Sequence, residues 1–161
     1  MQDRNEILKD GFWSYSEVCK VAKMFGYVPE ENPPEAKIQK LKQIINRCLL
    51  HYRPVPGELE LVGVYLYREE YQPAGYDCTY GITQDIGGGK AIICLSLGLL
   101  SYNMPVFHDL VFLHECCHLY AMNHGERFQD RFNEVEFDYY FYNEARFDGA
   151  IPKPKRKGWK M

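Results

Sequence analysis

A chain of 161 residues with 46% hydrophobic and 25% charged residues has the composition of one globular domain, large enough to bury a core of its own. Its net charge of −3 gives no general electrostatic reason for binding nucleic acid or a membrane surface. The first residues are polar and mixed in charge, unlike a secretory signal, and the longest apolar run (91–100) is too short to cross a bilayer. We therefore expect a cytoplasmic protein without a membrane segment.

Six cysteines occur along the chain, and no two of them form a CxxC pair. This spacing argues against a zinc ribbon and against a redox dithiol. Without a secretion signal, we expect free thiols that pack like small apolar residues. The six residues are Cys19, Cys48, Cys78, Cys94, Cys116 and Cys117.

The N-terminal part of the chain, residues 1–37, is expected to form a helical segment at 4–26 and a proline-rich linker. Residues 38–150 are expected to form the main domain, and 151–161 a flexible basic tail. At the start of that domain, apolar residues recur at spacings of three and four across 38–52, which predicts an amphipathic helix.

Three runs with strand character follow, at 59–67, 76–86 and 90–100. The glycine triplet at 87–89 separates the second run from the third and predicts a hairpin. The triplet lacks the flanking residues of a phosphate-binding loop, so we favour a turn over a nucleotide site.

A largely apolar helix is expected at 103–122, with Pro105 in its first turn. A helix that is apolar around most of its circumference is buried, and here it would pack under the sheet. A second helix, rich in acidic and aromatic residues, is expected at about 126–147.

The sequence HECCH within the first of these helices predicts a metal site. His114 and His118 are four residues apart, so on a helix they share one face and lie about 6 Å apart along the axis. Both imidazoles can therefore reach one zinc ion. Glu115 follows the first histidine, where its carboxylate can reach a zinc-bound water as general base for attack on a carbonyl group.

A catalytic zinc site normally has three protein ligands and one open position. His124 is the natural third ligand, because Asn123-His124-Gly125 can form a turn out of the helix if Gly125 adopts a positive φ. Glu134 and Glu144 are alternatives: each begins an N-E-x-x-x-D stretch that resembles the glutamate helix of thermolysin-type (gluzincin) peptidases. A solvated acidic face is the simpler interpretation of these two stretches.

Three segments of the chain resemble the SprT/Spartan-like zinc metallopeptidases and the related short YgjP-like group. AGYDCTYGI (74–82) resembles a strand of that family, and 92–118, which ends in LHECCH, resembles its core. NHGERF (123–128) is similar to its third-ligand segment. The ordered series of strand, helix and HGxxF is more specific than HExxH alone.

The resemblance implies an α+β, zincin-like fold in which an antiparallel three-stranded sheet packs against the HExxH helix, with flanking N- and C-terminal helices. It also implies zinc on His114, His118 and His124, and peptide hydrolysis with Glu115 as base. An extended peptide substrate would dock by strand addition at a sheet edge. The residues implied for that edge are Ile92, Ile93, Cys94, Leu95 and Ser96.

Two features bear on the partners of such an enzyme. The zinc ribbon of many SprT proteins is absent, since there is no CxxC, which weakens the case for DNA-linked substrates. The basic tail could contact phosphates, although such an end is more often solubilising. A non-catalytic, zinc-stabilised module that binds protein or nucleic acid is the alternative function. The basic residues are Lys153, Lys155, Arg156, Lys157 and Lys160.

Overall fold

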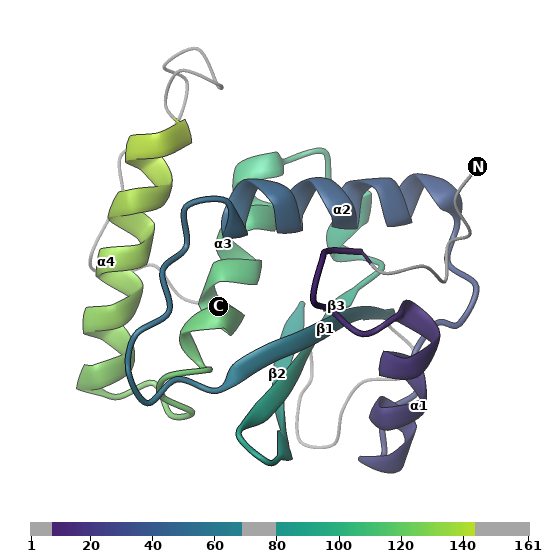
Figure 1. Ribbon diagram of the computed structural model, residues 1–161. Helices are drawn as coiled ribbons and strands as arrows, with labels where there is room; N and C mark the ends of the chain where they lie inside the picture. Colours follow the sequence, from purple (N-terminus) through teal and green to yellow (C-terminus); the bar gives the residue numbers. More distant parts are fainter. Residues whose placement is uncertain (1–7, 69–79, 144–161) are drawn as a thin grey trace.

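The computed structural model describes residues 8–68 and 80–143, which form an α+β fold (Figure 1). Within these residues there are four α-helices, a 3₁₀ turn and one three-stranded sheet. Residues 144–161, which include Glu144 and the basic tail, lie outside the described residues, as does Cys78. The elements in chain order are α1 (Tyr15–Met24), α2 (Glu35–Leu49), β1 (Glu60–Tyr67), β2 (Gly81–Gly87), β3 (Lys90–Ser96), η1 (Leu99–Ser101), α3 (Pro105–Cys117) and α4 (Glu126–Asn143).

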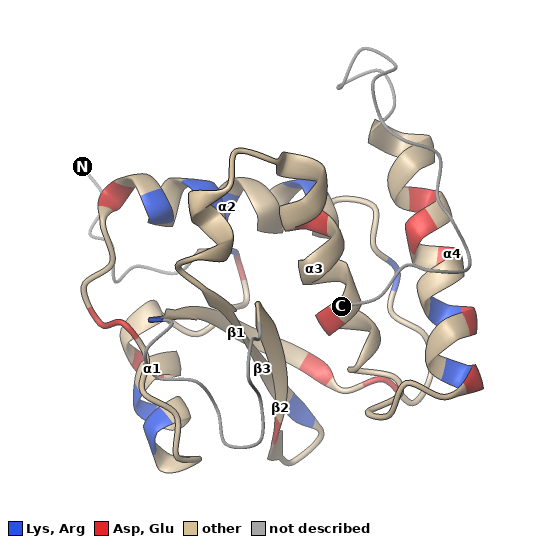
Figure 2. Cartoon of the chain, turned by 180° about the vertical axis from the view of Figure 1, so that it is seen from behind, with Lys and Arg blue, Asp and Glu red and all other residues tan. Residues whose placement is uncertain are grey.

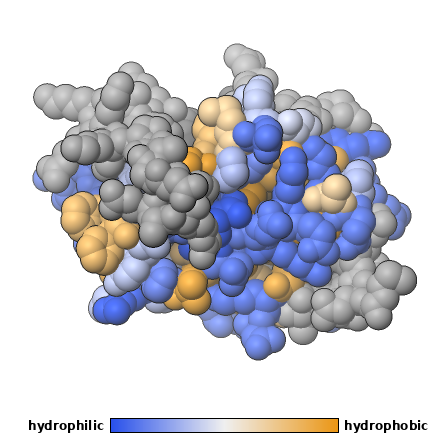
Figure 3. All heavy atoms as spheres, turned by 90° about the horizontal axis from the view of Figure 1, so that it is seen from above, coloured by the Kyte–Doolittle hydropathy of each residue, from blue (hydrophilic) through white to orange (hydrophobic). Residues whose placement is uncertain are grey.

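The helices begin and end at local signals. α1 starts well after the expected position 4, because the side chain of Ser14 caps it by accepting a hydrogen bond from the Glu17 amide at 3.2 Å. α2 follows Pro34 and buries the apolar face that its periodicity predicts. Its outward face is polar, and the described part of the surface seen from above is mostly hydrophilic, with smaller hydrophobic patches (Figure 3). None of the described helices is long and apolar enough to cross a membrane.

The sheet is mixed, with strand order β1-β3-β2. β2 and β3 form the expected antiparallel hairpin, and Gly87, Gly88 and Gly89 adopt φ values of 90°, 65° and 76° in its turn. β1, however, is parallel to β3, so the expectation of a wholly antiparallel sheet is wrong. Residues 62–67 of β1 are all buried, as is typical of a strand that pairs in parallel and is covered on both faces.

Helices cover both faces of the sheet. A Cβ at Gly63 would lie 2.2 Å from Cγ2 of Val18, so α1 packs directly against β1 on the face of Gly63. Side chains alternate between faces, which places Leu66 and its register partner Leu95 on the other face. Gly81 of β2 pairs with Leu95 and therefore lies on the same face as Leu95. A Cβ at Gly81 would lie 3.0 Å from Cγ of Glu115 in α3. α1 and α3 therefore lie on opposite faces (Figure 1).

The helix α3 is surrounded by protein, as predicted from its apolar circumference: every residue from His108 to Cys117 is buried. The carboxylate of Asp109, with no exposed surface, accepts two hydrogen bonds from Arg47 of α2, at 2.7 and 2.8 Å. Tyr139 of α4 donates a third at 2.7 Å. One buried carboxylate thus joins three helices. Basic residues along α2 and acidic residues along α4 make the two helices opposite in charge (Figure 2).

Replacement of Asp109 by Asn should destabilise the protein by about 3–5 kcal/mol, because it leaves the guanidinium of Arg47, whose side chain is only 14% exposed, without its counter-charge. The measurement is the free energy of unfolding in urea. Glu31→Gln is the matched control: it breaks an ion pair with Lys23 whose side chains are 50% and 56% exposed, and should cost less than about 1 kcal/mol. Equal effects of the two substitutions would contradict a central role for Asp109.

A second buried carboxylate, on α4, has no compensating cation among the described residues. Glu136 is 2% exposed, and no group within residues 8–68 and 80–143 hydrogen-bonds its Oε2 atom. Burial raises the pKa of Glu136 to about 7. Because the folded state holds this proton more tightly than the unfolded chain does, the stability contributed by Glu136 is greatest at low pH. It falls as the pH rises through the pKa of the folded state.

Glu136→Gln should therefore stabilise the protein by roughly 1–3 kcal/mol above pH 7 and have little effect near pH 4. Thermal unfolding across this pH range measures the difference. Glu134→Gln, on the exposed side of the same helix, is the control and should leave the pH profile of stability unchanged. A pH-independent gain from Glu136→Gln would show that this carboxyl does not titrate in that window.

Candidate metal centre

Three imidazole rings converge at the C-terminal end of α3. Nε2 of His124 lies 3.1 Å from Nε2 of His114 and 3.1 Å from Nε2 of His118. Imidazole nitrogens bound to one tetrahedral zinc at 2.0–2.1 Å lie roughly 3.3 Å apart, so these three residues match the donor set and spacing of a His₃ zinc site. The structure thus brings together the three predicted ligands in a cluster that could hold a metal ion.

His118 does not lie inside the helix, although it was expected there. α3 ends at Cys117, and the following amides of 118–120 bond to carbonyls three residues earlier, so the chain leaves the helix in a tight turn. His118 keeps φ −69° and ψ −15°, close to helical values. Its side chain therefore still shares the face of His114, as the spacing of four predicted.

The protonation of His118 is set by the backbone. Its Nδ1 lies 3.0 Å from the carbonyl oxygen of Ala121, which can only accept, so Nδ1 carries the proton and donates it. The lone pair of Nε2 then faces the other two rings, as a metal ligand requires. Burial lowers the pKa of His118 and lowers that of His114 to about 3, so both are neutral at pH 7. Neutral imidazole is the form that binds metal.

His124 reaches the cluster from the exposed turn between α3 and α4. The expectation that Gly125 adopts a positive φ there is wrong, since Gly125 is not among the glycines of positive φ. Its amide instead donates to Oδ1 of Asn123 at 3.1 Å, and a Cβ on Gly125 would approach that oxygen to 3.0 Å. The carbonyl of Gly125 accepts the amide of Gln129 at 3.0 Å as α4 begins. The absence of a side chain at Gly125 therefore makes room for the Asn123 side chain, and no left-handed backbone conformation is involved.

Two phenylalanines of α4 form an apolar wall beside the imidazoles. Phe128 contacts all three rings, with centroid distances of 4.8 Å to His114, 4.5 Å to His118 and 4.9 Å to His124. Phe132 stacks parallel to Phe128 and lies 5.8 Å from His114. Phe128 belongs to the NHGERF segment, whereas sequence reasoning missed Phe132. The helical spacing of four in α4 was the available signal.

Glu115 is buried on the sheet side of the same helix end and is 7% exposed. Thr83 of β2 places its hydroxyl 2.9 Å from Oε1 of Glu115 and 2.7 Å from the backbone carbonyl of the same residue. Burial raises the pKa of Glu115 to about 7, while the hydrogen bonds from Thr83 act in the opposite direction. Thr83 was not identified from the sequence, because its position depends on strand register.

The strand implied as the substrate edge is in the centre of the sheet. β3 pairs with β1 on one side and with β2 on the other, and Ile92, Ile93, Cys94, Leu95 and Ser96 are all buried. No backbone edge of β3 is available for strand addition, so this expectation is wrong. Within the described residues, the open edge beside Glu115 belongs to β2.

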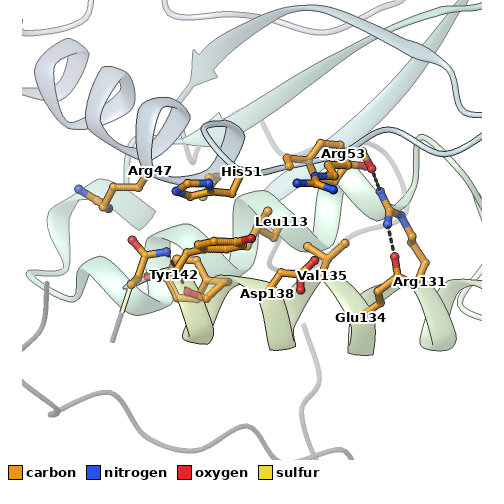
Figure 4. A pocket seen from close by; sticks show the side chains of 13 residues that line it. Arg47, His51, Arg53, Leu113, Arg131, Glu134, Val135, Asp138 and Tyr142 are labelled. Carbon is orange, nitrogen blue, oxygen red and sulfur yellow. Dashed lines mark hydrogen bonds and ion pairs between the residues drawn. The ribbon is translucent and has the colours of Figure 1, made fainter. Parts of the chain in front are cut away.

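A cavity of about 260 Å³ lies between α2, the residues that follow it, α3 and α4 (Figure 4). Its lining includes Leu113, Arg131 and Glu134 but none of the three clustered histidines. Glu134, an alternative ligand, is 65% exposed there and bonds to Arg131 at 3.0 Å. His51, also in the lining, stacks on Tyr142 at a centroid distance of 3.9 Å. The cavity and the histidine cluster are separate features.

Compared with known proteins, the chain matches no family model, no curated protein and no solved structure.

Substitution of His124 by Ala should lower zinc affinity by more than about 100-fold, since loss of a direct ligand exceeds the usual cost of losing an outer partner of a ligand. Purified wild-type protein should contain about one zinc per chain by elemental analysis, and competition with a chelating dye gives the affinities. His51→Ala is the control, because that ring stacks on Tyr142 away from the cluster. Unchanged affinity in the His124 variant would remove this residue from the ligand set.

Proposed function

We propose that the protein is a zinc-dependent metallopeptidase in which His114, His118 and His124 hold the metal and Glu115 moves the proton. The observation that supports this most directly is the convergence of three Nε2 atoms at the helix end where Glu115, the residue after His114, is buried. The resemblance to SprT-like and YgjP-like metallopeptidases points to the same residues. A bound zinc supplies Lewis acidity, which lowers the pKa of water and polarises a carbonyl group.

Glu115 is the general base of the proposed reaction. Its carboxylate accepts a proton from the attacking water as the water oxygen bonds to the peptide carbonyl carbon. It then delivers that proton to the departing amine nitrogen as the C–N bond breaks. Phe128 and Phe132 limit the access of bulk water to the imidazole side of the site, which strengthens electrostatic interactions within it.

The outer edge of β2 is the proposed docking surface for an extended peptide. Gly81 and Thr83 of this strand contact Glu115, so a peptide added to the edge runs past the carboxylate. Main-chain hydrogen bonds to an edge strand bind substrate with little dependence on sequence.

Glu115→Gln should retain one zinc per chain and lose roughly 10²- to 10⁴-fold in kcat for peptide hydrolysis, because the amide cannot accept the proton. Cleavage of unstructured proteins and of fluorogenic peptide libraries, read by mass spectrometry, provides the assay. Glu134→Gln is the control on an exposed carboxylate. A zinc-loaded wild type that cleaves none of these substrates would overturn the proposal.

A second candidate function is a zinc-stabilised binding module without turnover. It is favoured by the exposed aromatic side chains near the end of α4, where Phe137 and Phe141 are 64% and 68% exposed. Apolar surface of this kind often marks a protein-binding face. Zinc that raises the melting temperature of a protein without any peptidase activity would support this function over the first.

A further inference from the structure

The strand β2 contacts the proposed general base at Gly81 and at Thr83, whose hydroxyl lies 2.9 Å from the Glu115 carboxylate. We propose that Thr83 is a positioning residue that fixes Oε1 of Glu115 and leaves Oε2 to exchange the proton with water. This inference rests on the proposed peptidase function. It is carried by two short distances from Oγ1 of Thr83, 2.9 Å to Oε1 and 2.7 Å to the main-chain oxygen of Glu115.

The two contacts of the Thr83 hydroxyl constrain both the side chain and the main chain of Glu115. The hydroxyl has a single proton, so it donates to Oε1 or to the carbonyl oxygen at a given moment, and both acceptors belong to Glu115. The Glu115 side chain is therefore held against its own backbone, and the end of α3 is held against β2. The hydroxyl contacts Oε1, so Oε2 is the oxygen that we assign to the exchange of the proton with water.

Packing on the same strand supports this arrangement. Gly81 lies two residues before Thr83 and therefore on the same face of β2. A Cβ at Gly81 would lie 3.0 Å from Cγ of Glu115 and 3.1 Å from Cδ2 of Leu95. The missing side chain at Gly81 makes space for the glutamate, and the hydroxyl at Thr83 sets its direction.

Positioning matters because the proton transfer is short-range. Oε2 takes one proton from the attacking water while the water oxygen forms a bond to the carbonyl carbon. The same proton passes to the amine nitrogen when the C–N bond breaks, so Glu115 ends the cycle as it began. A carboxylate free to rotate away from the water loses rate without losing substrate affinity.

The test compares Thr83→Val, which has nearly the shape of threonine but no hydroxyl, with Thr83→Ser, which keeps the hydroxyl. The valine variant should lose roughly 10- to 100-fold in kcat, with KM and zinc content unchanged, and the serine variant should recover most of that loss. The matched control is Tyr27→Phe. It removes a hydroxyl that donates a 2.8 Å hydrogen bond to Oε1 of Gln84, on the opposite face of β2, and it should leave kcat unchanged.

A double substitution and crystal structures separate positioning from a general structural effect. In a Glu115→Gln background, Thr83→Val should cause no further loss of kcat, because it acts through that carboxylate. Crystal structures of wild type and Thr83→Val should show the Glu115 carboxylate rotated in the variant only. Additive losses of kcat, or an unmoved carboxylate, would overturn the role of Thr83.

The crystal structures also separate this inference from the proposed function. If the wild type cleaves no peptide, the peptidase proposal fails, and the crystal structures still show whether Thr83 holds Glu115. If the wild type is active and Thr83→Val is equally active, the positioning role fails and the peptidase proposal stands.

Discussion

The position of α3 is the constraint on which the rest of the structure depends. The helix is enclosed over most of its length, yet its last turn and the next residue must present two imidazoles on one side and a carboxylate on another. The ion pair between the buried Asp109 and the partly buried Arg47 fixes α3 against α2, and Tyr139 of α4 bonds to the same carboxylate. A buried charge pair is costly to desolvate, but its geometry is specific.

Once α3 is fixed, the candidate site forms from segments that are distant in the sequence. The turn after α3 supplies His124, and the same turn supplies the Ala121 carbonyl that sets the tautomer of His118. α4 covers the imidazoles with Phe128, and β2 holds Glu115 through Thr83. Each of these groups acts on a residue of α3 or of its continuation, so a shift of that helix would disturb all of them together.

Local patterns in the sequence were sufficient for the parts of this architecture that depend on local geometry. The spacing of His114 and His118 predicted a shared face, and the Gly87–Gly89 triplet predicted a hairpin. The pairing of β1 with β3 could not be predicted in this way, because strand order is decided by packing between distant segments. The same limit led to the choice of β3 as substrate edge and concealed Thr83, whose contact depends on how β2 lies against α3.

The register of β2 is therefore part of the site and not only of the fold. Side chains alternate along a strand, so a slip of one residue would replace Thr83 and Gly81 by Ile82 and Gln84 on the face of Glu115. The glycine turn next to β2 sets the pairing, and the one register irregularity between β2 and β3 lies at Asp85–Gly87, beside that turn. From Gly81 to Asp85 the pairing is regular. The register irregularity of the hairpin therefore lies away from Glu115. Beside the carboxylate, the side chains of β2 alternate strictly between the two faces of the sheet.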